Sequence, residues 1–255
     1  MECLNERNNS SSARANFSLA TVAIGICVIG VFITGILAAK EINLPGKLVY
    51  RDVFSGSGRH VLTGTKPGVD TTGASWTYNG NGAPAGDDWR ANGAAPAKSG
   101  FGTLDYLPLH VEVGRIYSLS CVLAPDPGTT GRWFALGFFD HSPFGKSKTE
   151  GPWMTLTDTA GWATYVGSPN LRSNHMSHSL SHSVPLGRTA EIILNTSGKH
   201  WTVRWFYNGR SLGSHTYAAN PTKIGGVGIA VYNGQQGKVR NFEVRMSPGI
   251  KYQRE

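Results

Sequence analysis

One apolar run near the N-terminus constrains this chain most. Residues 17–39, beginning at Phe17 and ending at Ala39, contain no charged side chain. At ~1.5 Å per residue, a helix over this range would be about 34 Å long, enough to cross a hydrocarbon core of about 30 Å. The preceding residues are polar, and nothing later in the chain is comparably apolar. We therefore expect a single-pass membrane anchor in front of an exported domain.

The predicted organisation has five parts. They are a cytoplasmic tail (1–16), a transmembrane helix (17–39), a linker (40–46), a β-domain (47–248) and a C-terminal tail (249–255). Basic residues lie on both sides of the helix and give its orientation no strong bias. The short tail is expected to stay inside, which places the large domain in the periplasm or outside the cell. A cleaved signal is the alternative, although Leu37 stands where the cleavage site prefers a small residue.

The start of the apolar run carries a second resemblance. Asn16-Phe17-Ser18-Leu19 and the helix after it resemble the start of bacterial prepilins. In that family a Gly precedes the Phe and a Glu follows shortly after. Here Asn16 and Thr21 stand at those positions. The resemblance implies an alternative role as a filament or pilin-like envelope subunit.

The exported part reads as an all-β domain. The whole chain has 33 Gly and 13 Pro, and only 16% of its residues are charged. Glycine and proline punctuate short segments, and no helical apolar period follows residue 40. Asn208-Gly209 separates two of these segments and favours a two-residue hairpin. The predicted strands are 47–54, 59–65, 75–78, 103–113, 115–124, 132–140, 153–156, 162–166, 189–196, 200–207, 210–217, 224–232 and 237–246.

Several of these segments resemble bacterial laminin-G-like domains. The resemblance rests on residues 51–56 (RDVFSG), 114–120 (GRIYSLS) and 133–138 (WFALGF), and on the closing segments 225–232 and 239–244. It implies a concanavalin-A-like jelly roll, a two-sheet antiparallel sandwich. That superfamily includes lectins, adhesion modules and some glycosidases, so the fold does not select a function.

Cysteine usage excludes a disulfide within the β-domain. Cys3 lies in the tail and Cys27 in the apolar run, which leaves Cys121 alone in the exported part. Cys121 belongs to an alternating apolar segment, where an inward thiol packs as a small hydrophobic group. We expect a core cysteine and a fold stabilised by its core.

The net charge points to anionic partners. The chain carries a formal charge of +8, and acidic and basic residues cancel over residues 1–41, so the excess belongs to the β-domain. A basic surface favours acidic polysaccharide or anionic lipid. Lysine and arginine are scattered rather than clustered, so nucleic acid is not an expected partner.

Acidic and histidine side chains of the domain bear on two kinds of chemistry, glycoside hydrolysis and metal binding. Sandwich glycosidases place two carboxylates about 5–5.5 Å apart when they retain configuration. The chain has no closely spaced acidic set on a predicted strand, because Asp87-Asp88 lies in the loop 80–100. A polysaccharide-acting enzyme is therefore only an alternative. Three imidazoles, His175, His178 and His182, could bind a metal if their segment turned helically, but a polar loop is the simpler interpretation.

Calcium is the other cofactor that the resemblance implies, because loops of this superfamily bind it through carboxylates and carbonyls. No Asp-x-Asp-x-Asp spacing supports a ligand set. The candidate loop or strand-end carboxylates are Asp87, Asp88, Asp126, Asp140 and Asp158.

Tryptophan placement supplies the candidate ligand site. Three tryptophans, Trp133, Trp201 and Trp205, lie in alternating strands and are expected in the core. Others lie near Gly- and Pro-rich loops, where an indole beside polar groups can stack on a sugar. We expect noncatalytic binding of a glycan or of extracellular matrix, with candidate binding residues Trp76, Asp88, Trp89, Arg90, Trp153 and Trp162.

Overall fold

The computed structural model describes residues 46–54, 59–80, 88–90, 103–125, 133–139, 151–157, 161–167, 175–179, 184–218, 224–232 and 237–249. No helix within these ranges has the length and apolar character needed to span a membrane. The expected anchor at 17–39 and its prepilin-like start lie outside the described residues.

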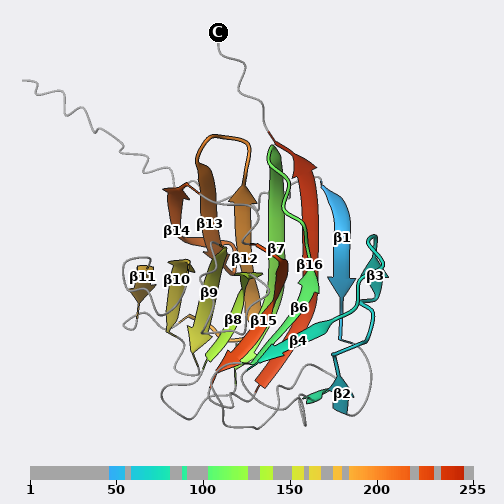
Figure 1. The fold of residues 1–255 in the computed structure, drawn as a ribbon. Helices are drawn as coiled ribbons and strands as arrows, with labels where there is room; N and C mark the ends of the chain where they lie inside the picture. Colours follow the sequence, from blue (N-terminus) through green and yellow to red (C-terminus); the bar gives the residue numbers. More distant parts are fainter. Residues whose placement is uncertain are drawn as a thin grey trace, which may run out of the picture. The chain divides into compact units, whose positions relative to one another are not determined.

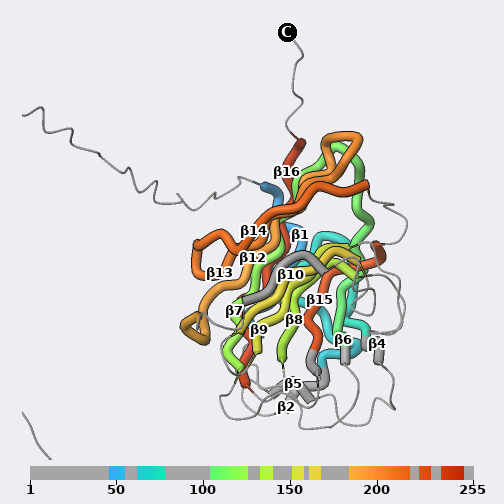
Figure 2. Tube along the Cα trace, turned by 90° about the vertical axis from the view of Figure 1, so that its left-hand side faces the viewer, coloured from blue at the N-terminus to red at the C-terminus, as the bar shows by residue number. Residues whose placement is uncertain are grey.

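Two antiparallel sheets form the domain (Figures 1 and 2). Sheet A contains, in spatial order, β14 (Arg210–Tyr217), β13 (Trp201–Tyr207), β12 (Arg188–Asn195), β7 (Arg115–Pro125), β16 (Gly237–Pro248), β1 (Lys47–Asp52) and β3 (Val69–Asp70). Sheet B contains β11 (His175–Ser179), β10 (Trp162–Val166), β9 (Pro152–Thr157), β8 (Trp133–Phe139), β15 (Gly226–Tyr232), β6 (Thr103–Pro108) and β4 (Thr77–Gly80). A separate pair joins β2 (Arg59–Val61) to β5 (Asp88–Arg90). The predicted two-sheet antiparallel jelly-roll sandwich is confirmed.

The core between the sheets follows from period-two alternation. Along β7, Tyr117, Leu119, Cys121 and Leu123 are buried, while the residues between them are partly exposed. The same pattern on β13 turns Val203 inward, so the side chains of sheet A meet those of sheet B in one cluster. Alternation places every second side chain on the same face of a strand. The expected burial of Cys121, Trp201 and Trp205 is confirmed.

Sheet B carries a second apolar layer on its other face. Leu104 on β6, Phe139 on β8 and Trp153 on β9 form a cluster separate from the core between the sheets. Each is at most 1% exposed, so the centre of this face is closed to solvent. Trp133, expected in the main core, instead packs against this second layer and is partly exposed.

Most predicted strands are present, with shifted ends. The hairpin at Asn208-Gly209 is confirmed, because both residues have the positive φ (50° and 74°) that a two-residue turn requires. The strands β3, β5 and β11 were not predicted. Each is short and lacks an apolar alternation, and each forms by pairing with a neighbouring strand.

Candidate functional site

A pocket of about 480 Å³ opens at the edge of the sandwich where β1 and β3 end sheet A. Four segments of the chain form its walls: the start of β1, the turn after β3, the segment after β6, and the last part of β16. Its lining residues are Lys47, Val49, Thr71, Thr72, Gly73, Ala74, Pro108, Leu109, His110, Glu112 and Met246. Pockets of about 300–1,000 Å³ commonly hold small-molecule ligands.

The pocket combines an apolar floor with polar walls. Val49 and Leu109 are buried and contribute the apolar surface. Lys47, His110 and Glu112 are exposed on its walls. Together with the hydroxyl groups of the turn after β3, these side chains can donate and accept hydrogen bonds. The arrangement suits a small polar ligand that also has an apolar face.

Asp70 shapes the turn that forms one wall. Its Oδ1 accepts hydrogen bonds from the Thr72 backbone N–H at 2.7 Å and from the Thr72 hydroxyl at 2.8 Å. Desolvation alone would raise the pKa of Asp70, but the hydrogen bonds from Thr72, Gly73 and Ala74 outweigh it and lower that pKa. The ionised carboxylate therefore holds the turn in the form that lines the pocket.

Tyr50 connects two walls of the pocket from their buried side. Its side chain is fully buried, and its hydroxyl lies 2.8 Å from the Thr72 hydroxyl and also donates to the Pro108 carbonyl oxygen. The Thr72 hydroxyl in turn donates to Asp70. The hydroxyls of Tyr50 and Thr72, with one proton each, take part in all three of these contacts. Burial raises the pKa of Tyr50, and the nearby Asp70 charge adds to the rise while the Thr72 hydrogen bond opposes it. Tyr50 therefore stays neutral and fixes the positions of Thr72 and Pro108.

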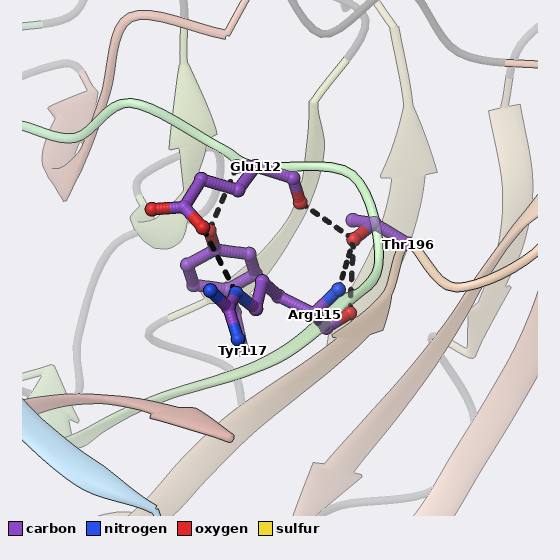
Figure 3. Close-up of polar contacts among 4 residues, drawn as sticks. All are labelled: Glu112, Arg115, Tyr117 and Thr196. Carbon is purple, nitrogen blue, oxygen red and sulfur yellow. Dashed lines mark hydrogen bonds and ion pairs between the residues drawn. The ribbon is translucent and has the colours of Figure 1, made fainter. Parts of the chain in front are cut away.

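The segment after β6 is fixed by a second polar network, which Figure 3 shows. The Tyr117 hydroxyl accepts a hydrogen bond from the Glu112 backbone N–H at 2.8 Å. The Glu112 carboxylate forms an ion pair with Arg115, with Oε2 and Nε 2.9 Å apart. The Thr196 hydroxyl lies 2.7 Å from the Glu112 carbonyl oxygen and 2.9 Å from that of Arg115. These contacts hold the Glu112 wall of the pocket against the end of β12.

Trp76 is a buried side chain and not the exposed indole that its place in the sequence suggested. Its side chain is 1% exposed, and its Nε1–H donates to Asp52 Oδ2 at 2.9 Å. Its ring packs edge-on against Phe242 with centroids 5.0 Å apart. The nearby loop suggested an exposed indole, but the chain folds Trp76 into the core between the sheets.

Trp153 and Trp162 also depart from an exposed position. Trp153 is 1% exposed, donates to the Gly167 carbonyl oxygen at 2.8 Å, and stacks on Tyr165 with centroids 3.9 Å apart. It belongs to the closed layer on the outer face of sheet B. Trp162 is partly buried against the main core. The loops beside these residues in sequence did not predict their packing.

Asp88, Trp89 and Arg90 form a strand rather than a loop. They make up β5, in which Trp89 pairs with His60 and Arg90 with Arg59 of β2. This corrects their predicted loop position. Their role in binding stays a prediction.

The histidine segment is also a strand. His175 and His178 lie on β11, where His175 pairs with Tyr165 and His178 with Ala163. For His175–Ser179, the strand replaces both the expected polar loop and the helical turn that would bring the imidazoles together. His182 lies outside the described residues.

Within the ranges that the structure describes, no group of three His, Cys, Asp or Glu side chains is close enough to hold a metal ion. Asp87, Asp126, Asp140 and Asp158 lie outside these ranges, and a calcium site that uses them stays a prediction.

No protein-family model and no curated protein sequence matches the chain. Among solved structures, an endo-1,3-beta-glucanase from Streptomyces sioyaensis is similar with a TM-score of 0.53 and 14% identity, over 79% of this chain and 96% of that chain. The Emp47p carbohydrate recognition domain gives a TM-score of 0.49 and 8% identity, over 80% and 98%. The exoplasmic/lumenal domain of VIP36 gives 0.44 and 8%, over 82% and 100%.

At such low identity the glucanase comparison shows the fold alone. The chain therefore has a concanavalin-A-like sandwich, and its laminin-G-like resemblance stays a prediction. The pocket residues were missed by sequence reasoning. They come from four segments far apart in the chain, and only the sheet topology brings them together.

Proposed function

We propose that the sandwich is a noncatalytic glycan-binding module and that the edge pocket holds its ligand. The pocket carries the proposal: about 480 Å³ of space combines the hydroxyls of Thr71 and Thr72 with Lys47 and His110 over an apolar floor. A sugar offers hydroxyl groups and an apolar ring face, which match both parts of this lining.

The related folds make glycans the first ligand class to test. The glucanase is named for an action on a 1,3-beta-glucan, and the Emp47p domain is named a carbohydrate recognition domain. These names describe the glucanase and the Emp47p domain, not this chain. For this chain, the chemistry of the pocket is the support.

The pocket favours binding over hydrolysis. Glycoside hydrolysis normally uses two carboxyl groups that flank the scissile bond. Of the described lining residues, Glu112 alone carries a carboxylate, and it is paired with Arg115. Among the described lining residues, Glu112 therefore has no second carboxyl group to act with.

A second binding position is proposed at β5. Trp89 could stack on a sugar ring, and the neighbouring Arg90 could donate to an anionic group. If this position binds the ligand, Trp89→Ala should weaken glycan binding by about 1–3 kcal/mol. The melting temperature of the Trp89→Ala variant should not fall.

We also propose that residues 17–39 anchor the domain and present it outside the cytoplasm. The uncharged length of this run supports the proposal. The full chain should stay in the membrane fraction through carbonate washing, with its C-terminus open to external protease. A mature chain beginning near Lys40 would refute the anchor, and one beginning at Phe17 would favour the prepilin-like alternative.

The full-length protein in mild detergent should be applied to a glycan array alongside the double variant Lys47→Met/His110→Leu. Loss of two polar partners should weaken binding to the retained glycans by about tenfold or more. Lys199→Met/His200→Leu is a matched control, because it removes the same two residue types from an exposed turn that does not line the pocket.

Three results would count against the proposal. Equal glycan binding by wild type and the pocket variant would remove the pocket as the site. Selective loss in Trp89→Ala would move the site to β5. Failure of the wild-type protein to retain any glycan would reject glycan binding itself.

A further inference from the structure

We propose that the outer face of sheet A is a second binding surface, and that it binds an anionic polysaccharide chain along β16. This surface is separate from the pocket in function, and the inference does not depend on what the pocket binds. Its basis is a set of cations that the strand register places on one face.

A bulge in β16 gathers these cations. Residues three apart on a regular strand point to opposite faces. On β16 the register shifts between Arg240, which pairs with Val122, and Glu243, which pairs with Ser120. The intervening Asn241 has φ of 53°, and Phe242 enters the core. The bulge therefore returns Arg240 and Glu243 to the same outer face.

The strand register places further charged residues in line along β16, in a row that we call the charged column. Lys238 and Arg240 precede the bulge on the outer face, and Arg245 follows Glu243 there. Successive positions on one face are about 6.6–6.8 Å apart, so the column from Lys238 to Arg245 spans about 20 Å. A surface of this length fits several units of a chain rather than one sugar.

Neighbouring strands widen the cationic surface. Arg51 on β1 pairs with Glu243. Arg204 on β13 lies in the same cross-strand row as Ile193, Ser118 and Arg245. Among the described residues, this face therefore carries five cations, which are Lys238, Arg240, Arg245, Arg51 and Arg204. It carries two carboxylates, Glu191 and Glu243.

Glu243 orders part of this surface in advance. Its Oε2 lies 2.7 Å from Nη2 of Arg51, and its Oε1 accepts a hydrogen bond from Nε of Arg245. Arg245 also donates from Nη1 to the Gly46 carbonyl oxygen at 3.3 Å. A guanidinium has five N–H donors, so both arginines keep donors beyond these contacts. Holding them in place lowers the entropic cost of binding an anion.

The other cations share this face with Glu191 and Glu243 but are not held by them in ion pairs. Arg204, Lys238 and Arg240 are exposed, and within the described ranges none forms an ion pair. Ser118 and Ser120 lie between them on β7; the Ser118 hydroxyl donates to Glu191 Oε1 at 2.9 Å, and Ser120 offers a further hydroxyl group. Repeated positive charge with interspersed hydroxyls complements the carboxylate or sulfate groups of an acidic glycan.

Other anionic partners fit this face less well. Single-stranded nucleic acid needs aromatic side chains on which bases stack, and in the described part of this face Phe206 alone is aromatic. A membrane surface favours protruding apolar groups. Of the exposed large hydrophobic residues described, only Val69 pairs onto this face, at its edge.

The test uses the full chain in neutral detergent with immobilised heparin and polygalacturonate, and dextran as an uncharged control. Both acidic chains should be retained at low salt and released as salt rises, whereas dextran should not be retained. Long oligomers should compete better than disaccharides, because a disaccharide cannot span the column.

The decisive variant is Lys238→Gln/Arg240→Gln, with Lys199→Gln/Arg210→Gln as its matched control. Both variants remove one lysine and one arginine that are exposed, but the control positions lie in the turn after β12 and at the start of β14. Loss of two cations from the column should weaken acidic-glycan binding by about tenfold or more, whereas the control should bind like the wild type.

Specific outcomes would overturn the inference. Equal weakening in both variants would show that net charge, not this face, drives binding. Retention by vesicles with 30% phosphatidylserine, but by neither acidic glycan, would assign the face to lipid. Normal heparin binding by the column variant, with loss only in Lys47→Met/His110→Leu, would assign acidic chains to the pocket.

Discussion

The Trp76 indole and the Asp52 carboxylate join two segments that lie 24 positions apart. Trp76 Nε1–H donates to Asp52 Oδ2 at 2.9 Å, and Asp52 Oδ1 accepts the Phe54 backbone N–H at 2.9 Å. Phe54 has φ of 51°, and its ring lies 5.9 Å from that of Trp76. One carboxylate therefore fixes both the left-handed turn after β1 and the tryptophan that closes this end of the core.

We expect replacement of Trp76 to unfold the domain more readily. Trp76→Ala should lower the free energy of unfolding by about 3–5 kcal/mol, as for a large buried aromatic residue. Trp76→Phe keeps much of the packing, and Asp52→Asn keeps the shape but weakens the charge-assisted bond, so each should cost about 1–3 kcal/mol. Chemical denaturation measures all three. An unchanged denaturation midpoint in Trp76→Ala would show that the indole is not part of the core.

Glu243 should make stability depend on acid pH. Partial burial would raise the pKa of Glu243, but the hydrogen bonds and charges of Arg245 and Arg51 lower it below its usual value. A carboxyl group with a lowered folded-state pKa stabilises the fold above its unfolded pKa, about 4.3, and loses that effect as pH falls through the folded value.

The comparison is Glu243→Gln against the wild type in thermal melts from pH 7 to pH 3. Wild type should be more stable at pH 7, and the gap should close below about pH 4.3. Glu112→Gln is the control, because it removes an exposed ion pair of the kind that contributes about 0–1 kcal/mol. A gap that stays constant across this range would contradict the role given to Glu243.

Cys121 should not react in the folded protein. Its side chain is fully buried and its Sγ lies 3.3 Å from the Arg240 carbonyl oxygen. Burial raises the pKa of the Cys121 thiol far above its usual value, and the thiolate is the reactive form. In a Cys3→Ser/Cys27→Ser background, a maleimide should therefore label Cys121 only as the protein unfolds. Fast labelling under native conditions would mean that this part of the core opens locally.

The sequence predicted those features that depend on neighbours along the chain. Alternation along β7 placed Cys121 in the core, and Asn208-Gly209 placed a hairpin. It did not predict β11, because His175–Ser179 has polar residues and gains its strand conformation only from pairing with β10. A strand without apolar alternation has no signal of its own.

The candidate site shows the same limit. Trp76 and Trp153 lie beside loops in the sequence, but burial is decided by the sheet faces on which they pack. The pocket joins the start of β1 to turns after β3 and β6, so no local motif could mark it. The bulge that aligns the cations of β16 also has no sequence signature beyond a single Asn241.

Two glycines should respond very differently to a methyl group. Gly209 has φ of 74°, and a Cβ built there would have no atom within 4 Å. Gly209→Ala should therefore cost only the left-handed backbone conformation, about 1–2 kcal/mol. At Gly228, a Cβ would lie 2.2 Å from the Asp105 carbonyl oxygen and 2.8 Å from Cα of Tyr106. Because β15 pairs with β6 there, Gly228→Ala must push these two neighbouring strands of sheet B apart.

We expect Gly228→Ala to lower the free energy of unfolding more than Gly209→Ala does. The loss should reach or exceed the upper end of the range typical of overpacking, about 1–3 kcal/mol. Urea denaturation of both variants measures the difference. A semisynthetic protein with D-alanine at position 209 is the sharper control, because the D-residue favours positive φ and should restore wild-type stability or exceed it. Equal losses of stability for the two L-alanine variants would contradict the close approach of β15 and β6, and with it the pairing register of these two strands.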